Sequence, residues 1–333
     1  MIDLPLIWGA IIALGVLIYV VLDGFDLGVG ILFPWAPLKA QRDIMMNSVA
    51  PVWDGNETWL VLGGTALFGA FPAAYAALLP AFYMPLIIML LALIFRGVAF
   101  EFRFRDGRHR GGWDLAFTSG SVVATFAQGV VLGAFIQGVE VHNGAFAGGS
   151  LDWLTAFSLM TGCGLVAGYA LLGATWLILK TEGALQEMAY AWARRLLLLV
   201  LFFVALVSLW TPLEHEAIAA RWFTWPNLLW LSPVPIVTAA TAGGLWLGLE
   251  RRRELTPFLL AIALFALSYL GLGVSLWPYV VPRALTIWQA ASPAGSQIFI
   301  LVGVLLLLPL IIGYTAYAYR VFRGKVRSGE GYH

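Results

Sequence analysis

Residues 6–33 read LIWGAIIALGVLIYVVLDGFDLGVGILF and form the first long apolar run of the chain. This run exceeds the roughly 20 residues that a helix needs to cross the hydrocarbon core of a bilayer. Its only charged residues are Asp23 and Asp26. A carboxylate at the centre of a bilayer costs at least about 2.5 kcal/mol on insertion scales, so these two acids need a partner or a function.

The composition of the whole chain agrees with a membrane protein. Of its 333 residues, 61% are hydrophobic and only 11% are charged, against roughly 45–50% and about 25% in soluble domains. Too few polar side chains are available to cover a water-exposed surface. The composition therefore excludes a cytosolic enzyme, a nucleic-acid-binding protein and a disordered protein. The formal net charge of +1 also gives no reason to expect a polyanionic partner.

We expect an all-α polytopic membrane protein that forms one transmembrane domain over residues 1–333. Helices are favoured because backbone groups in lipid must find their hydrogen bonds within the segment, and the alternation typical of barrel strands is missing. The second predicted span begins with polar residues and the sixth is short. The nine predicted spans are Leu6–Phe33, Trp53–Phe71, Ala74–Phe95, Trp113–Gln137, Trp153–Leu179, Leu196–Trp210, Leu228–Leu249, Pro257–Trp277 and Gln297–Tyr319.

The basic residues predict the orientation of these spans. Of the 19 lysines and arginines, 16 fall on one side of the nine spans, only Arg221 and Arg283 fall on the other, and Arg96 lies within or at the edge of the third span. Loops rich in Lys and Arg remain in the cytoplasm. The sequence thus predicts an outer N-terminus and a cytoplasmic C-terminus.

Asp23 and Asp26 are three residues apart and share one helix face. Because two ionised acids on one face repel, we expect either a bound proton or a cation between them. The alternative is that they hold helices together by hydrogen bonds or by pairing with Arg96. Gly24 and Gly28 form a small-xxx-small pair that permits close approach of another helix.

A second polar group opens the second span, where residues 51–60 read PVWDGNETWL. One interpretation is a helix cap formed by Asp54 or Asn56, with Glu57 completing a capping box. The other is functional, because Glu57 lies one turn deeper and is flanked by Trp53 and another tryptophan.

A third polar group ends the third span, where residues 95–103 read FRGVAFEFR. Arg96 is always charged and can bind carboxylates or a propionate through two nitrogens. Its alternative is to extend to the cytoplasmic surface, with Glu101 solvated. Since Asp54 and Glu101 both lie at the cytoplasmic face, they could open a proton path that leads inward to Glu57 and Asp26.

The remaining polar residues point to packing. The four histidines, His109, His142, His215 and His333, fall in predicted loops or at the terminus, so we do not expect this chain to ligate a haem alone. The single cysteine, Cys163, excludes an internal disulfide and is expected to be a small core residue. Glycines and polar residues of the fourth and fifth spans, including Gln128, favour tight helix packing with interhelical hydrogen bonds.

The three polar motifs, taken in order and at their spacing, strongly resemble subunit II of the cytochrome bd quinol oxidases, including the cyanide-insensitive members. The resemblance is specific over the first third of the chain and looser beyond it. It implies nine transmembrane helices arranged as two four-helix bundles plus one peripheral helix. It also implies a bacterial cytoplasmic (inner) membrane location.

The resemblance further implies an obligate partner, subunit I, which holds haem b and haem d. The complex oxidises quinol, reduces dioxygen to water and takes the protons from the cytoplasm. In that family, acids matching Asp54 and Glu101 line the proton path, although some members have Asp at the second position. Residues matching Asp23, Asp26 and Arg96 lie near the subunit interface and the haem region, where we also expect Trp53. A structural quinone in this chain and a small single-helix subunit are left open.

Two other functions compete with an oxidase subunit. A proton-coupled secondary transporter would also place acids in the membrane, but it should show interrupted helices in two inverted halves. Here the intramembrane acids are confined to the first three spans. A purely structural subunit is the third candidate. Beyond the complex itself, membrane lipid is the only other expected contact of the chain.

Overall fold

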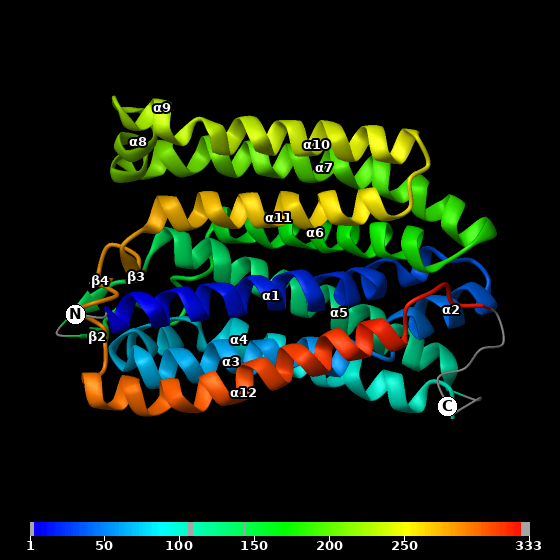
Figure 1. Cartoon of the computed structure of the whole chain (residues 1–333), viewed down its shortest axis with the longest axis horizontal. Coiled ribbons are helices and arrows are strands. Elements are labelled where there is room, and N and C mark those ends of the chain that lie inside the picture. Colours follow the sequence, from blue (N-terminus) through cyan, green and yellow to red (C-terminus); the bar gives the residue numbers. More distant parts are fainter. Residues whose placement is uncertain (1–2, 106–108, 143, 328–333) are drawn as a thin grey trace.

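The computed structural model describes residues 3–105, 109–142 and 144–327 as long helices that lie side by side (Figure 1). Two short hairpins complete the fold, β1 (Val141–His142) with β2 (Ala145–Phe146) and β3 (Tyr279–Val281) with β4 (Leu285–Thr286). The helices are α1 (Leu4–Leu32), η1 (Phe33–Trp35), α2 (Lys39–Val49), α3 (Trp53–Ala70), α4 (Pro72–Phe102), α5 (Arg110–Gln137), α6 (Ala156–Lys180), α7 (Gly183–Glu214), α8 (Glu216–Phe223), α9 (Asn227–Leu231), α10 (Pro233–Glu250), α11 (Leu255–Leu276) and α12 (Ala294–Val321).

Among the described residues, eight helices are long and apolar enough to cross a bilayer, which confirms an all-α polytopic membrane protein. They are α1, α4, α5, α6, α7, α10, α11 and α12, each of which corresponds to one predicted span. Helix α3 matches the second predicted span and has 18 residues. It is not counted with the eight, because Asp54, Asn56 and Glu57 make its first two turns polar.

Two predicted spans differ from the structure at their ends. Helix α7 begins at Gly183, 13 residues before the predicted Leu196. The pair Arg194–Arg195 interrupts the apolar run, but the helix continues because Ala189, Trp192 and Ala193 are buried against the core. The seventh predicted span is divided into α9 and α10, since Pro233 begins a new helix after Ser232.

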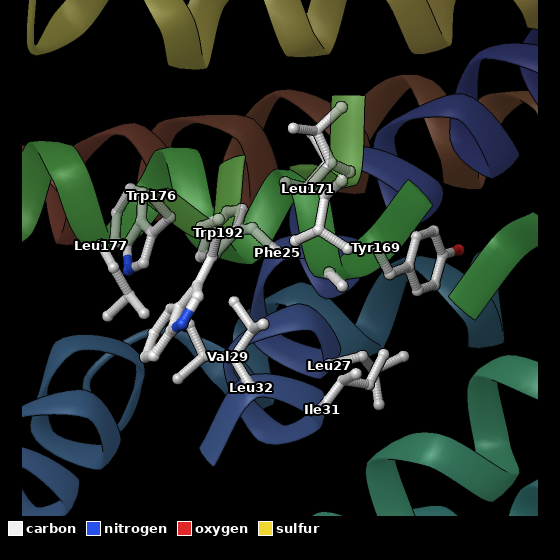
Figure 2. Packing of buried hydrophobic residues seen from close by; sticks show 14 of the residues in the cluster. Phe25, Leu27, Val29, Ile31, Leu32, Tyr169, Leu171, Trp176, Leu177 and Trp192 are labelled. Atoms are coloured by element: carbon white, nitrogen blue, oxygen red, sulfur yellow. The ribbon is translucent and has the colours of Figure 1, made fainter. Parts of the chain in front are cut away.

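Helix α1 lies at the centre of the molecule and packs against α3, α5 and α6. Figure 2 shows the packing of α1 against α6, where the Phe25 ring stacks on Trp176 with centroids 4.2 Å apart. Gly28 permits this close approach, because a Cβ atom there would lie 1.8 Å from the carbonyl oxygen of Tyr169. The predicted small-xxx-small contact is thus confirmed.

The connections divide between the two ends of the helices (Figure 1). The N-terminal residues, α8, α9 and both hairpins lie at one end, whereas α2 and the last described residues lie at the other. We call this second end the basic end, because the α4–α5, α6–α7 and α10–α11 connections and the segment after α12 bring their lysines and arginines there. Arg108 and His333 lie outside the described residues.

Two features of the surface correct or extend the sequence analysis. Cys163 is exposed on α6, so the prediction of a core cysteine is wrong. The small-residue pattern around it serves the opposite helix face, where the Thr161 hydroxyl donates to the Gly129 carbonyl of α5 at 2.9 Å. Helix α12 is exposed along most of its length and packs mainly on α3.

Candidate functional site

Arg96 is the centre of a buried polar cluster. It lies near the basic end of α4, and its side chain is fully buried. Its Nη1 atom donates to Asp23 Oδ1 of α1 at 3.0 Å and lies 3.7 Å from Glu57 Oε2 of α3. Three helices therefore converge on one guanidinium, and the alternative of an Arg96 that extends to the surface is wrong.

Two aromatic rings cover this guanidinium. Trp53 of α3 stacks on Phe100 of α4, with ring centroids 4.8 Å apart and planes 6° apart. The Arg96 Cζ atom lies 5.9 Å from the Trp53 centroid and 5.7 Å from that of Phe100. A cation near aromatic ring faces is stabilised, most strongly where water is excluded. The rings thus help to hold a charge at a depth where hydration is lost.

The hydrogen bonds at Asp26 come from uncharged side chains. Asn56 Nδ2 donates to Asp26 Oδ2 at 2.7 Å, and the Tyr319 hydroxyl of α12 donates to Asn56 Oδ1 at 3.0 Å. Asn56 is buried and does not cap its helix, since the N-cap position of α3 is Val52 and makes no side-chain cap bond. The capping interpretation of this motif is therefore wrong.

Beside Asp23, a chain of hydrogen bonds runs from Tyr19 of α1 to side chains of α5 and α6. Tyr19 lies close enough to Asp23 to interact with its carboxylate. The Tyr19 hydroxyl accepts a hydrogen bond from Gln128 Nε2 at 2.7 Å. The Tyr169 hydroxyl donates to Gln128 Oε1 at 3.0 Å. This arrangement confirms the interhelical hydrogen bonds expected of the fourth and fifth spans.

The charges of the cluster do not balance when every acid is ionised. Asp23, Asp26 and Glu57 face one guanidinium, so two negative charges would remain uncompensated. Among the described residues, Asp23 Oδ2 and Asp26 Oδ1 also have no hydrogen-bond partner. Uncompensated buried charge is strongly unfavourable. The geometry is therefore suited to holding protons on the acids, or water at their free oxygens.

Asp54 and Glu101 lie at the surface of this chain, outside the buried cluster. Asp54 is exposed in the first turn of α3, close enough to act electrostatically on Glu57. Glu101 is 63% exposed and lies 3.5 Å from Arg105, one turn along the same chain segment. The structure thus brings Asp23, Asp26, Trp53, Glu57 and Arg96 together, with Asp54 and Glu101 nearer the basic end.

The uncharged members of the network could not be recognised from the sequence. Asn56 was considered only as a cap, and Tyr19 and Tyr319 were not singled out. Their signal was weak because tyrosine is common near membrane interfaces. The intramembrane acids lie in the first three predicted spans, yet Tyr319 joins their cluster from α12, the last helix.

The structure offers little for direct ligation of a metal. Among the described residues, no group of three or more His, Cys, Asp or Glu side chains is arranged to hold a metal ion. The described histidines lie at helix ends or in a hairpin: His109 before α5, His142 in β1 and His215 after α7. A haem bound by this chain alone has no histidine at membrane depth in the described part of the chain.

Comparisons with known proteins agree on one family. Residues 4–322 match the family described as cytochrome bd terminal oxidase subunit II. Cytochrome bd-I ubiquinol oxidase subunit 2 of Escherichia coli K12 is 31% identical, with 98% of this chain and 96% of the relative covered. Cytochrome bd ubiquinol oxidase subunit 2 of Bacillus subtilis 168 is 28% identical, with 97% of each covered. The structure of bd oxidase from Geobacillus thermodenitrificans has the same fold, with a TM-score of 0.78, 21% identity and coverage of 96% of this chain and 99% of that chain.

Proposed function

The chain belongs to the family of cytochrome bd terminal oxidase subunit II, and we propose that its buried acids deliver protons for oxygen reduction in that oxidase. It is a multi-pass membrane protein and one subunit of a quinol oxidase, an oxidoreductase of the respiratory chain. It works with subunit I, and the family implies haems in the complex. Family membership disfavours the secondary transporter.

The chemistry of the complex explains why such a subunit needs proton-carrying groups. Reduction of dioxygen to water consumes one proton for every electron, and the haems supply the electron chemistry when bound in subunit I. A low-dielectric membrane interior blocks protons unless titratable side chains or water carry them. A subunit without haem ligands of its own can therefore still limit the rate of the whole reaction.

The proposal includes the arrangement in the membrane. Nine helices span the bilayer, α3 among them, in a single transmembrane domain. The four helices α1, α3, α4 and α5 form one bundle, α6, α7, α10 and α11 form the other, and α12 is peripheral. The basic end faces the bacterial cytoplasm and the N-terminus faces outward, because basic loops stay on the cytoplasmic side.

The route we propose begins at Asp54 and Glu101, the acids nearer the basic end. Protons pass from there to Glu57, which is only partly buried, and then to Asp23 beside Arg96. Asp26, held by Asn56, provides a second buried acceptor. The observation that carries this proposal is the convergence of three acids on a single buried arginine.

Arg96 has a positioning role in this route. It holds Asp23 at 3.0 Å and Glu57 at 3.7 Å, so it keeps two acids of different helices within reach of each other. Its positive charge lowers the cost of placing a carboxylate at this depth. Trp53 and Phe100 exclude water from one side of the guanidinium and so direct the remaining access towards Glu57.

The test uses the complete oxidase purified with this chain carrying Asp54→Asn or Glu101→Gln. We expect quinol-driven oxygen consumption to fall about tenfold or more, the scale of a lost proton-transfer group, while haem content stays near normal. Glu187→Gln is the matched control, because Glu187 is an exposed acid at the basic end that pairs with Arg252. Unchanged turnover in both variants would remove Asp54 and Glu101 from the route.

The same preparation separates the oxidase subunit from a purely structural one. Loss of the haem spectrum in the Asp54 or Glu101 variants would favour a structural role. A reduced-minus-oxidised spectrum of the complex purified through a tag on this chain should show haem d absorption. A single chain without haem would reject the oxidase assignment.

A further inference from the structure

A pocket of about 620 Å³ opens at the basic end between α6, the α2–α3 connection and the residues that follow α12. Three of its lining residues are cations and one is an acid: Lys180, Arg323, Lys325 and Glu254. Apolar side chains, among them Val52 and Leu179, line the rest. The pocket adjoins the Arg96 cluster only through Tyr319, which lines it and bonds to Asn56, and its charged residues have no role in the proton route proposed above.

Lys180 places an incompletely satisfied charge at the wall of this pocket. The residue ends α6 and is 7% exposed. Its ammonium donates to the Phe322 carbonyl at 2.6 Å and lies 5.3 Å from the Trp176 ring centroid. Among the described residues, no carboxylate lies within 4.0 Å of it. A buried ammonium has three donors and normally a counter-charge, so this one lacks an anionic partner.

Two further hydrogen-bond donors of the pocket, Trp176 and Arg323, also lack a partner among the described residues. The Trp176 indole is 5% exposed, lines the pocket, and its Nε1 atom has no hydrogen-bond partner among the described residues. Arg323 also lines the pocket, and no ion pair in the described part of the chain includes it. Lys325, in contrast, is neutralised by Glu254 at 2.6 Å. In the described part of the chain, Lys180 and Arg323 thus have no anionic partner and Trp176 Nε1 has no acceptor, so these groups suit a ligand that offers negatively charged acceptor oxygens.

The position of the pocket narrows the choice of anion. It lies where α6 and α12 end, at the side that basic loops assign to the cytoplasm, which is the level of lipid headgroups. Basic pockets between transmembrane helices at this level suit anionic headgroups. The apolar part of the lining suits a glycerol backbone and the first carbons of an acyl chain better than a free ion. We propose that the pocket binds the phosphate group of an anionic phospholipid of the cytoplasmic leaflet.

The bound lipid would also secure the segment after α12. This segment is held by the hydrogen bond from Val326 N to the Lys180 carbonyl at 2.8 Å and by the Lys180 bond to Phe322. A phosphate shared by Lys180 and Arg323 would link α6 to this segment directly. Lipid binding and attachment of the segment therefore support each other.

The experiment measures lipid binding to the delipidated complete oxidase in detergent, by native mass spectrometry and by the thermal unfolding midpoint. Phosphatidylglycerol is titrated against phosphatidylcholine and against inorganic phosphate. The variants are Arg323→Gln and Lys180→Gln, and the matched control is Arg320→Gln, an exposed arginine one turn away that does not line the pocket. The glutamine at position 180 keeps a donor for the Phe322 carbonyl, and Arg323→Gln alters only an exposed residue.

We expect phosphatidylglycerol to bind and raise the midpoint, and phosphatidylcholine to do neither. Arg323→Gln should weaken phosphatidylglycerol binding about tenfold, the scale of one charge-assisted hydrogen bond, with Arg320→Gln within twofold of wild type. Equal weakening in the Arg320 control would overturn the pocket and indicate general surface attraction. Equal stabilisation by inorganic phosphate would overturn the lipid assignment in favour of a soluble phosphate.

Discussion

Arg96 determines whether the two buried acids, Asp23 and Asp26, and the partly buried Glu57 can coexist in this fold. Its guanidinium is fully buried, bonded to Asp23 and close to Glu57, with two rings beside it. Its Nε and Nη2 atoms have no partner in the described part of the chain. The cluster is thus only partly satisfied, which is unfavourable for stability but gives protons or water room to enter.

Replacement of Arg96 by glutamine should destabilise the complex by about 3–5 kcal/mol, because it leaves buried acids without their counter-charge. The double variant Asp23→Asn with Arg96→Gln should recover part of that loss, since it removes a charge from each side. The thermal unfolding midpoint of the purified complex measures both. Equal destabilisation of the single and double variants would contradict an energetic coupling between Arg96 and Asp23.

The charged members of the site could be identified from sequence, whereas the neutral ones could not. Asp23, Asp26 and Arg96 stand out because burial of a charge is costly whatever the fold. Asn56 and Tyr319 are separated by 263 positions, and only the packing of α12 on α3 brings them together. A neutral polar residue becomes informative only when its neighbours are known.

At the scale of helices, the contact between α1 and α6 positions the cluster. Gly28→Ala would place a methyl group against the backbone of Tyr169, at 1.8 Å from its carbonyl oxygen, so the two helices would have to separate. We expect a loss of about 3 kcal/mol or more in stability. Gly64→Ala is the control, because nothing lies within 4 Å of its Cβ position in α3; it should be neutral or stabilising by up to about 1 kcal/mol.

Both glycine variants are compared by yield and thermal unfolding of the complete oxidase. Similar midpoints for Gly28→Ala and Gly64→Ala would contradict the close helix contact.

The ion pair between Glu254 and Lys325, which helps to hold the segment after α12, should weaken as the pH falls. Hydrogen bonds from Lys325 and Gln186 stabilise the ionised Glu254 and lower its pKa below the ordinary 4.5. A lowered folded-state pKa gives stability that is complete above the unfolded pKa and is lost as the pH falls through the folded value. The midpoint difference between wild type and Glu254→Gln should therefore be constant at neutral pH and shrink below pH 4.5. A difference that grows on acidification would have the wrong sign.

Helix ends were harder to predict than helix identity. Apolar runs located the spanning helices, because a helix in lipid needs apolar side chains. Helix α7, however, begins 13 residues before its apolar run. That extension is amphipathic and is stabilised by packing of Leu185 and Ala189 against the core. Conversely, Pro233 begins a new helix within a continuous apolar run and so divides it into α9 and α10, for steric reasons that hydropathy does not detect.

At the scale of the whole molecule, the asymmetry of the basic loops predicts a single orientation. The test replaces Cys163 by alanine and introduces one new cysteine, at Ser150 in the turn before α6 or at Arg251 between α10 and α11. A membrane-impermeant maleimide should label Ser150→Cys in intact cells and Arg251→Cys only after the membrane is opened. Labelling of Arg251→Cys in intact cells would reverse the orientation.

The composition of the chain predicted an all-α membrane protein. The resemblance of three polar motifs in its first third to subunit II of the cytochrome bd quinol oxidases predicted that it is a subunit of an oxidase. The sequence could not predict that α12, the last helix, returns to cover α3. Such a contact depends on the packing of α12, which is apolar on nearly every face, so its sequence gives no periodic signal of the face that meets α3.

In the proposed function, the acids around Arg96 carry protons into the oxidase. Proton uptake during quinol-driven oxygen reduction tests it most directly, measured for the complete complex with Glu57→Gln and with Glu187→Gln as control. The glutamine keeps the size of Glu57 but cannot accept and release a proton. We expect uptake in Glu57→Gln to be about tenfold slower or more at unchanged haem content, whereas uptake at the wild-type rate would show that Glu57 carries no protons.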